Sequence, residues 1–133
     1  MRRLVKIFLF FIPLMLLGGC NMQNKFLYFP SSEVPSGRML ASVNMKLWPG
    51  AAGDYRGLTS AKDSSAFNGT IVLFHGNGGT ALDREFYVEP LMKLGFWVIL
   101  AEYPKYGGRT GKVGEKPFVA DGLETIKFAY KQY

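Results

Sequence analysis

The sequence contains very few of the side chains from which catalytic sites and crosslinks are usually built. Its 133 residues include one cysteine, Cys20, and one histidine, His75, and no serine follows Ser65. A lone cysteine excludes a disulfide within the chain. The net charge is +6, but no basic run is interleaved with aromatic residues, so nucleic acid is not an expected partner. We also predict no metal site and no cofactor, and the length suits one domain rather than two.

The N-terminus has the composition of a leader. The pair Arg2-Arg3 precedes residues 4–17, which are apolar except at Lys6 and Pro13. A membrane span would need about 18 or more uninterrupted apolar residues, so this stretch predicts a signal-peptide core. It ends in Leu17-Gly18-Gly19-Cys20, where small residues stand directly before the only cysteine.

That ending resembles the lipobox of bacterial lipoproteins. The resemblance implies that residues 1–19 are removed as a signal peptide and that Cys20 carries lipid, palmitate included. Several acyl chains on one residue hold a protein on a membrane, because each buried methylene contributes about 0.8 kcal/mol. We therefore expect a location in the bacterial cell envelope, and Asn21 favours the outer membrane in a Gram-negative cell. The alternative is a plain secretory signal followed by a free thiol.

A short apolar strand and a glycine-rich loop are expected at the centre of the folded domain, residues 26–133, which follows a tether at residues 20–25. Ile71 to Phe74 lead straight into His75-Gly76-Asn77-Gly78-Gly79. An apolar run without polar alternation predicts a strand buried on both faces of a parallel sheet. Ligands bind at the carboxyl ends of such strands, where glycines let backbone N–H groups approach them. Two earlier strands are predicted at residues 40–48 and 55–59.

A strand–helix–strand unit should follow from the glycine-rich loop. Residues 80–94 predict a helix that Thr80 and Asp83 cap, and that Pro90 kinks or splits. Residues 96–101 are fully apolar and predict a second strand, so the unit is βαβ. The buried face of the helix is expected to carry Tyr87, Leu91 and Leu94.

The last predicted element is a helix that Pro117 opens and that continues almost to the end of the chain. Its expected buried stripe, at i, i+4, i+7 and i+11, is Val119, Leu123, Ile126 and Tyr130. With the βαβ unit, this helix places the chain in the α/β class, with a mostly parallel sheet flanked by helices.

Two motifs in register carry a resemblance to the α/β-hydrolases. The loop at 75–79 and the turn Glu102-Tyr103-Pro104-Lys105-Tyr106-Gly107-Gly108 are similar to those of serine hydrolases whose loop reads HGN-x-G. The resemblance covers about residues 26–133 and implies the N-terminal half of that fold. It implies that backbone N–H groups of Asn77 and Gly78 form part of an oxyanion hole for ester or amide hydrolysis, and that His75 is structural.

The chain also departs from this family. Lys105 stands where the family often has glycine and Arg109 where it often has serine. No G-x-S-x-G elbow and no second histidine follow, so a Ser-His-Asp triad cannot be built from this sequence. We therefore expect an incomplete, truncated domain with no catalytic residues of its own. In the family the third strand lies between the fourth and the fifth, so Ile71 to Phe74 should form an exposed edge that promotes self-association.

Two other functions are compatible with the sequence. Gly76-x-Gly78-x-x-Ala81 fits the G-x-G-x-x-A fingerprint of dinucleotide-binding domains, and Glu102 ends the next strand, where a ribose-binding acid would stand. The third reading is a non-enzymatic lipoprotein that uses half of a hydrolase fold as a binding surface.

Overall fold

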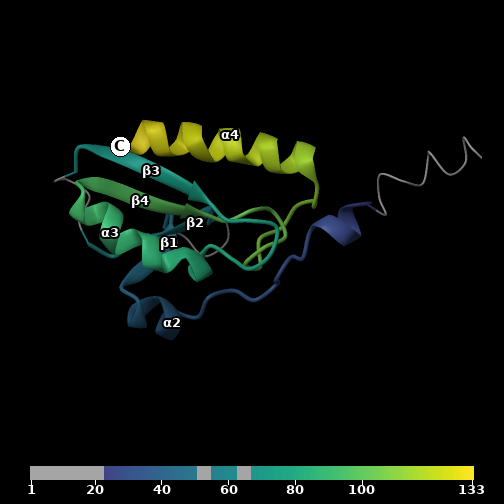
Figure 1. Ribbon diagram of the computed structural model, residues 1–133, viewed down its shortest axis with the longest axis horizontal. Coiled ribbons are helices and arrows are strands. Elements are labelled where there is room, and N and C mark those ends of the chain that lie inside the picture. The colour runs from purple at the N-terminus through teal and green to yellow at the C-terminus, as the bar shows by residue number, and fades with distance from the viewer. Residues whose placement is uncertain (1–22, 51–54, 63–66) are drawn as a thin grey trace, which may run out of the picture.

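The domain is built on a four-stranded mixed sheet with helices on both faces (Figure 1). The computed structural model describes residues 23–50, 55–62 and 67–133. The strands are β1 Met45–Trp48, β2 Gly57–Ser60, β3 Gly69–Phe74 and β4 Phe96–Ala101, and their order across the sheet is β1-β2-β4-β3. Residues 23–27 are helical, so the described part of the predicted tether at residues 20–25 is not an extended linker. The later helices are α2 Gly37–Ser42, the 3₁₀ helix η1 Leu82–Tyr87, α3 Val88–Lys93 and α4 Glu115–Gln132. This arrangement confirms the α/β class.

The expectation of a mostly parallel sheet is wrong for these strands. Only β3 and β4 pair in parallel, whereas β1 with β2 and β2 with β4 are antiparallel. Parallel neighbours need a long crossover, and residues 75–95 supply one through η1 and α3. The link between β1 and β2, residues 49–56, is too short for such a crossover and returns the chain in the opposite direction.

Strand β4 forms the centre of the core. Val98 and Leu100 pack into a cluster with Leu40 of α2 and Val88 of α3, while Trp97 and Ile99 face the other side of the sheet. All five residues from 97 to 101 are at most 2% exposed. The prediction of a strand buried on both faces is therefore confirmed for β4.

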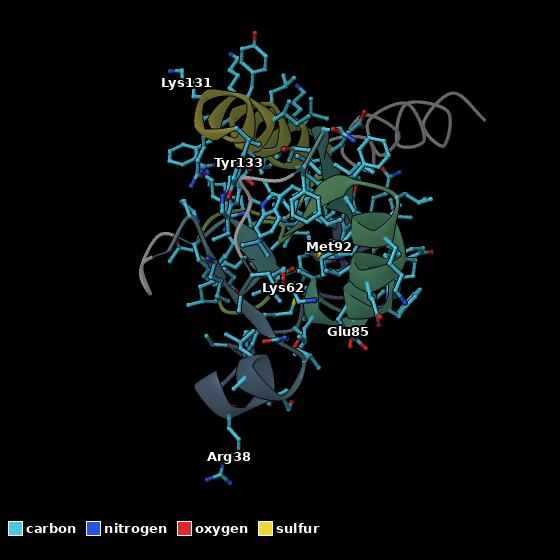
Figure 2. The ribbon with its side chains drawn as sticks, turned by 90° about the vertical axis from the view of Figure 1, so that its left-hand side faces the viewer. Arg38, Lys62, Glu85, Met92, Lys131 and Tyr133 are labelled. Carbon is cyan, nitrogen blue, oxygen red and sulfur yellow. The ribbon has the colours of Figure 1, made fainter. Side chains whose placement is uncertain are left out.

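Strand β3 lies at the edge of the sheet. Among the described strands it pairs only with β4, and all six of its residues are half-buried. The predicted edge is confirmed, whereas the expected burial on both faces is only partial, because nothing described covers the outer side. Figure 1 shows α4 lying across one face of β3 and β4, and α2 and α3 on the other face. In Figure 2, Arg38 of α2 and Lys131 of α4 mark the two opposite sides of the molecule.

The predicted helix at 80–94 exists, but it is divided into η1 and α3 at Tyr87, three residues before Pro90. Pro90 is the third residue of α3, a position where the missing N–H would have had no helical partner. The predicted cap is present only in part: the Asp83 carboxylate accepts from the Thr80 backbone N–H at 2.7 Å, but Ala81 is the N-cap residue of η1 and no side chain caps it. The expected buried face is only partly present: Leu91 packs against the core, but Tyr87 and Leu94 are 43% and 70% exposed, and Val88 is buried instead. A 3₁₀ turn has three residues rather than 3.6, so the faces no longer align.

Residues 40–48 do not form one strand, as was expected. The first part belongs to α2, which Ser36 caps by accepting a hydrogen bond from the Met39 N–H at 3.3 Å. Leu40 is buried under the sheet from this helix. Asn44 then turns the chain with a φ of 59°, and the strand begins only at Met45. The prediction was wrong because a short segment with loosely alternating apolar residues fits a helical turn as well as a strand. The second predicted strand, 55–59, corresponds to β2.

Helix α4 is present but turned by about one residue from the predicted orientation. Its buried residues are Phe118, Gly122, Thr125 and Ala129, and the predicted stripe of Val119, Leu123, Ile126 and Tyr130 is exposed. Gly122 faces the Phe74 ring of β3, which a Cβ at this position would contact at an ordinary 3.5 Å. Within residues 23–50, 55–62 and 67–133, the structure has no helix of the length and apolar character that a membrane crossing requires.

Candidate functional site

The glycine-rich loop starts at His75, where β3 ends, and runs beside the carboxyl end of β4. The His75 side chain is fully buried, and its Nδ1–H donates to the Gly76 carbonyl at 2.7 Å. Its Nε2 lies 2.7 Å from Oε1 of Glu102, the residue that follows β4. Both ring nitrogens are thus engaged inside the protein. His75 is a structural residue here and has no nitrogen free to act as a base toward a ligand.

Glu102 ties together both ends of the loop. Its side chain is fully buried, and while Oε1 pairs with His75, Oε2 accepts the backbone N–H of Ala81 at 2.9 Å. Sequence reasoning considered Glu102 only as a ribose-binding acid and did not pair it with His75. The available signal was an acidic residue directly after a fully apolar strand, because buried carboxylates are almost always paired.

The outer wall of the loop is formed by the N-terminal segment and by Tyr106. The carbonyl of Asn77 accepts from the Phe29 backbone N–H at 3.0 Å and from the Tyr106 hydroxyl at 2.7 Å. The Asn77 side-chain amide donates to the Leu27 carbonyl at 2.8 Å. Tyr106 is fully buried. The loop is therefore held from four elements at once: β3, β4, the turn after β4 and residues 27–29.

The backbone N–H groups of the loop are what remains available to a ligand. Among the residues that the structure describes, those of Gly76, Asn77 and Gly78 donate no hydrogen bond, whereas those of Thr80 and Ala81 do. Because the peptide is trans, a carbonyl and the next N–H point in opposite directions. His75 holds the Gly76 carbonyl inward, so the N–H of Asn77 points away from the ring. Gly76 and Asn77 are solvent-exposed, so these donors can be reached.

A Cβ atom would meet nothing within 4 Å at either Gly76 or Gly78, so the space in front of the loop is open. A hollow of about 240 Å³ borders the loop at Gly79 and Thr80. A larger one, about 370 Å³, lies between β1 and α3; Figure 2 shows Lys62, Glu85 and Met92, three of the residues that line it. No residue of the glycine-rich loop lines this larger hollow, so we do not assign it to the candidate site.

The turn after β4 carries the two departures from the hydrolase pattern. Lys105 adopts a φ of 73°, the left-handed conformation that glycine prefers. Arg109 donates to the Glu102 carbonyl and forms two bonds of 2.8 Å with the carboxylate of Asp121 in α4. Arg56, the residue before β2, pairs with the same carboxylate at 3.2 Å. Arg109 therefore fastens the turn to α4, and Asp121 links both to the start of β2.

Tyr55 supports this turn from beneath. Its hydroxyl donates to the Gly107 carbonyl. Burial, followed by the nearby Glu102 carboxylate, raises the pKa of Tyr55 to about 12. The hydroxyl therefore keeps its proton, and remains a donor to this carbonyl, throughout the neutral and mildly alkaline range.

The dinucleotide fingerprint is not matched by the required contacts. The Glu102 side chain is fully buried and bonded to His75 and Ala81, so ribose hydroxyls cannot reach it in this conformation. The segment after the loop is a 3₁₀ helix rather than the α-helix whose N-terminus holds a pyrophosphate. These contacts weigh against Gly76, Gly78 and Ala81 as a nucleotide site.

Cys20, the predicted lipidation site, lies outside the described residues, as does the whole predicted leader. The described residues contain no group of three or more His, Cys, Asp or Glu side chains that could hold a metal ion.

No protein-family model, no curated protein and no solved structure matches the chain.

Proposed function

We propose that this chain supplies the oxyanion-binding part of a lipid-anchored serine hydrolase of the α/β-hydrolase type, acting on ester or amide bonds. One observation carries the proposal: a loop at the carboxyl end of a parallel strand has adjacent N–H groups, at the exposed Asn77 and the half-buried Gly78, that donate to no described residue. Such donors stabilise the charge that develops on a carbonyl oxygen under attack. Each is worth roughly 3 kcal/mol of the activation barrier.

The strand order supports the finer assignment of the fold. The third strand of the α/β-hydrolases lies between the fourth and the fifth, and in this chain β3 lies beside β4 with its other side open. The antiparallel β1 and β2 precede the parallel βαβ unit. We propose that residues 26–133 correspond to the N-terminal part of that fold.

The nucleophile and the base of the proposed reaction would have to come from outside these 133 residues. His75 is the only histidine, and both of its nitrogens are engaged. We therefore expect the chain by itself to be inactive as a serine hydrolase. A fluorophosphonate probe should label no serine stoichiometrically, and labelling of one serine in the native but not the urea-unfolded chain would contradict this.

The membrane attachment is a separate part of the proposal and rests on Leu17-Gly18-Gly19-Cys20. In a bacterial host, Cys20→Ser should abolish both incorporation of labelled palmitate and cleavage before residue 20. Ala41→Ser, which changes an exposed residue of α2, is the control and should retain both. Equal palmitate incorporation in the wild type and Cys20→Ser would refute lipidation at this position.

The oxyanion function can be tested without a nucleophile. Methylphosphonate carries a tetrahedral, anionic oxygen group that resembles the charged intermediate of acyl transfer. When it is titrated into the ¹⁵N-labelled full chain in a mild detergent, the amide resonances of Gly76, Asn77 and Gly78 should shift with a common, saturable dependence. The amide of Gly95, in the turn before β4, should stay unchanged. The neutral dimethyl ester of the same phosphonate is the control and should leave all four resonances in place.

The same titration separates the competing functions. If NAD moves the loop and Ala81 amides and methylphosphonate does not, the dinucleotide function replaces the proposal. If neither ligand moves them, the oxyanion proposal is wrong and a non-enzymatic binding surface becomes the better account. Titration with the two ligands at matched ionic strength excludes a general salt effect on the exposed loop.

A further inference from the structure

The peptide unit between Asn77 and Gly78 is fixed by two donors from distant parts of the chain. Its carbonyl oxygen accepts the Tyr106 hydroxyl at 2.7 Å and the Phe29 backbone N–H at 3.0 Å. Phe29 and Gly78 also form an isolated parallel bridge. Because two donors on one carbonyl oxygen occupy both of its lone pairs, the peptide plane has little freedom to rotate.

The N–H of Gly78 belongs to this same peptide unit. The peptide is trans, so its N–H points away from the side on which Tyr106 and Phe29 hold the carbonyl. That N–H donates to no residue that the structure describes. The adjacent N–H, that of Asn77, is turned outward in the same way by the His75 ring acting on the Gly76 carbonyl. Two successive N–H groups, those of Asn77 and Gly78, are therefore turned away from the groups that hold their carbonyls, and neither donates to a described residue.

We propose that Tyr106 is a positioning residue that aims the Gly78 N–H at the oxyanion. The inference rests on the proposed function of the loop and adds a residue from the turn after β4 to it. Tyr106 would not touch the substrate. It acts through the Asn77 carbonyl, in the way that His75 acts through the Gly76 carbonyl.

The hydroxyl of Tyr106 is suited to this role. Burial raises the pKa of Tyr106, so the hydroxyl remains a proton donor at neutral pH. Its ring has a separate, packing role, since it lies 5.0 Å from the His75 ring and 6.0 Å from the Phe118 ring, measured between centroids. A change to phenylalanine therefore removes the hydrogen bond and leaves the ring in place.

The neighbouring Tyr103 provides a matched control. It lies in the same aromatic cluster, stacked on Phe118 at 4.7 Å, and burial raises its pKa as well. Its hydroxyl makes no hydrogen bond to any described residue. Tyr103→Phe and Tyr106→Phe thus remove the same atom from the same cluster, and only the second removes a bond to the loop.

The first measurement tests the positioning without a ligand. In the ¹³C,¹⁵N-labelled full chain in detergent, Tyr106→Phe should move the carbonyl ¹³C resonance of Asn77 and the amide of Gly78, because both belong to the affected peptide. Tyr103→Phe should leave both unchanged. If Tyr106→Phe leaves them unchanged, or if the two variants have the same effect, the inference is overturned whatever the loop binds.

The second measurement tests its consequence. Methylphosphonate should bind Tyr106→Phe about three- to tenfold more weakly than the wild type, the loss expected for one hydrogen bond, and Tyr103→Phe with unchanged affinity. An unchanged affinity in Tyr106→Phe would overturn the inference. If the wild type does not bind methylphosphonate, the proposed function fails, and the carbonyl resonance still decides whether Tyr106 holds the peptide.

A second variant keeps the test open if Tyr106→Phe does not fold. Phe29→Pro removes the other donor to the same carbonyl, and proline is compatible with the extended conformation of a bridge residue. It should shift the Asn77 carbonyl resonance in the same direction and weaken methylphosphonate binding. If it does neither, the peptide is not held by these two donors and the inference is wrong.

Discussion

Strands β3 and β4 are neighbours of equal length and similar hydrophobicity, yet their surroundings differ greatly. β4 lies between β2 and β3, and its residues from Val98 to Leu100 are completely buried. β3 has one partner among the described strands, and each of its residues is only half-buried. Hydrophobicity thus predicts that a segment forms an interior strand, but the strand pairing determines how much of it is covered.

The two strands are joined most firmly where they end. His75 follows β3 and Glu102 follows β4, and their side chains meet in the interior. Along the outer side of β3, by contrast, a groove of about 520 Å³ separates the strand from α4. Thr70 and Val72 line it from the strand, and Ile126 and Tyr130 from the helix. The candidate site therefore lies where side-chain hydrogen bonds join the two strands, and the groove lies along the edge of β3 that has no described partner strand.

The largest effect should come from breaking the junction between the two strand ends. Glu102→Ala leaves the His75 ring and the Ala81 N–H without their buried partner. Removing one member of a buried pair typically costs about 3 to 5 kcal/mol, a large share of a domain's stability. Urea unfolding followed by tryptophan fluorescence should show a chain that is largely unfolded at low urea concentration.

Glu124→Ala is the matched control for this change. Glu124 also pairs with an arginine, Arg56 at 3.1 Å, but its side chain is 68% exposed. An exposed pair contributes about 1 kcal/mol or less. If the two alanine variants lost similar stability, the buried pair would not be what joins β3 to β4 at the site.

The sequence predicted the strands, the loop and the last helix better than it predicted what they face. A run such as residues 96–101 specifies a strand by itself, because every side chain is apolar. The orientation of α4 was missed by one residue, because Phe118 and Val119 are both apolar and the small Gly122 and Ala129 of the buried face do not form a hydrophobic stripe. The pair between His75 and Glu102 was missed because residues 27 positions apart meet only through the strand register.

The outer side of β3 should promote self-association, and a charge there should suppress it. The strand has no charged residue and no proline, the usual protection of an edge. When the β3 edges of two molecules pair, Thr70→Lys adds a positive charge to each strand. The repulsion between these charges should weaken association by about tenfold or more. Sedimentation velocity of the full chain in detergent, across a concentration series, measures the effect.

Met39→Lys is the control for charge alone, because Met39 is 42% exposed on α2, away from the edge. It should associate as the wild type does. A wild-type chain that stays monomeric at every concentration would show that the open side of β3 is not adhesive. Equal effects of the two lysines would assign the association to another surface.

A smaller effect is expected at alkaline pH, beneath the turn that follows β4. The pKa of Tyr55 is about 12 in the folded chain, against about 10 for an unfolded tyrosine. The proton is thus held more tightly in the folded state, so its contribution to stability is complete below pH 10 and is lost as the pH rises towards 12. Tyr55→Phe should make the unfolding free energy less dependent on pH in this window, as measured by urea unfolding at pH 9 to 12. An identical slope in both proteins would contradict this assignment. Tyr103 and Tyr106, whose pKa values are also raised, should account for the slope that remains.

The smallest effect should be a gain in stability at Lys105, in the same turn. A non-glycine residue with a left-handed φ, here 73°, destabilises the folded state by roughly 1 to 2 kcal/mol. Glycine avoids this strain, but its greater freedom in the unfolded chain lowers stability by about 0.5 to 1 kcal/mol. Lys105 is exposed, and its side chain makes no hydrogen bond or ion pair with the described residues, so little else is lost. Lys105→Gly should therefore raise the unfolding free energy by about 0.5 to 1 kcal/mol. Lys112→Gly, at an exposed position without a positive φ, is the control and should be neutral or destabilising. If Lys105→Gly is also destabilising, the turn after β4 does not hold the conformation that presents Tyr106 to the loop.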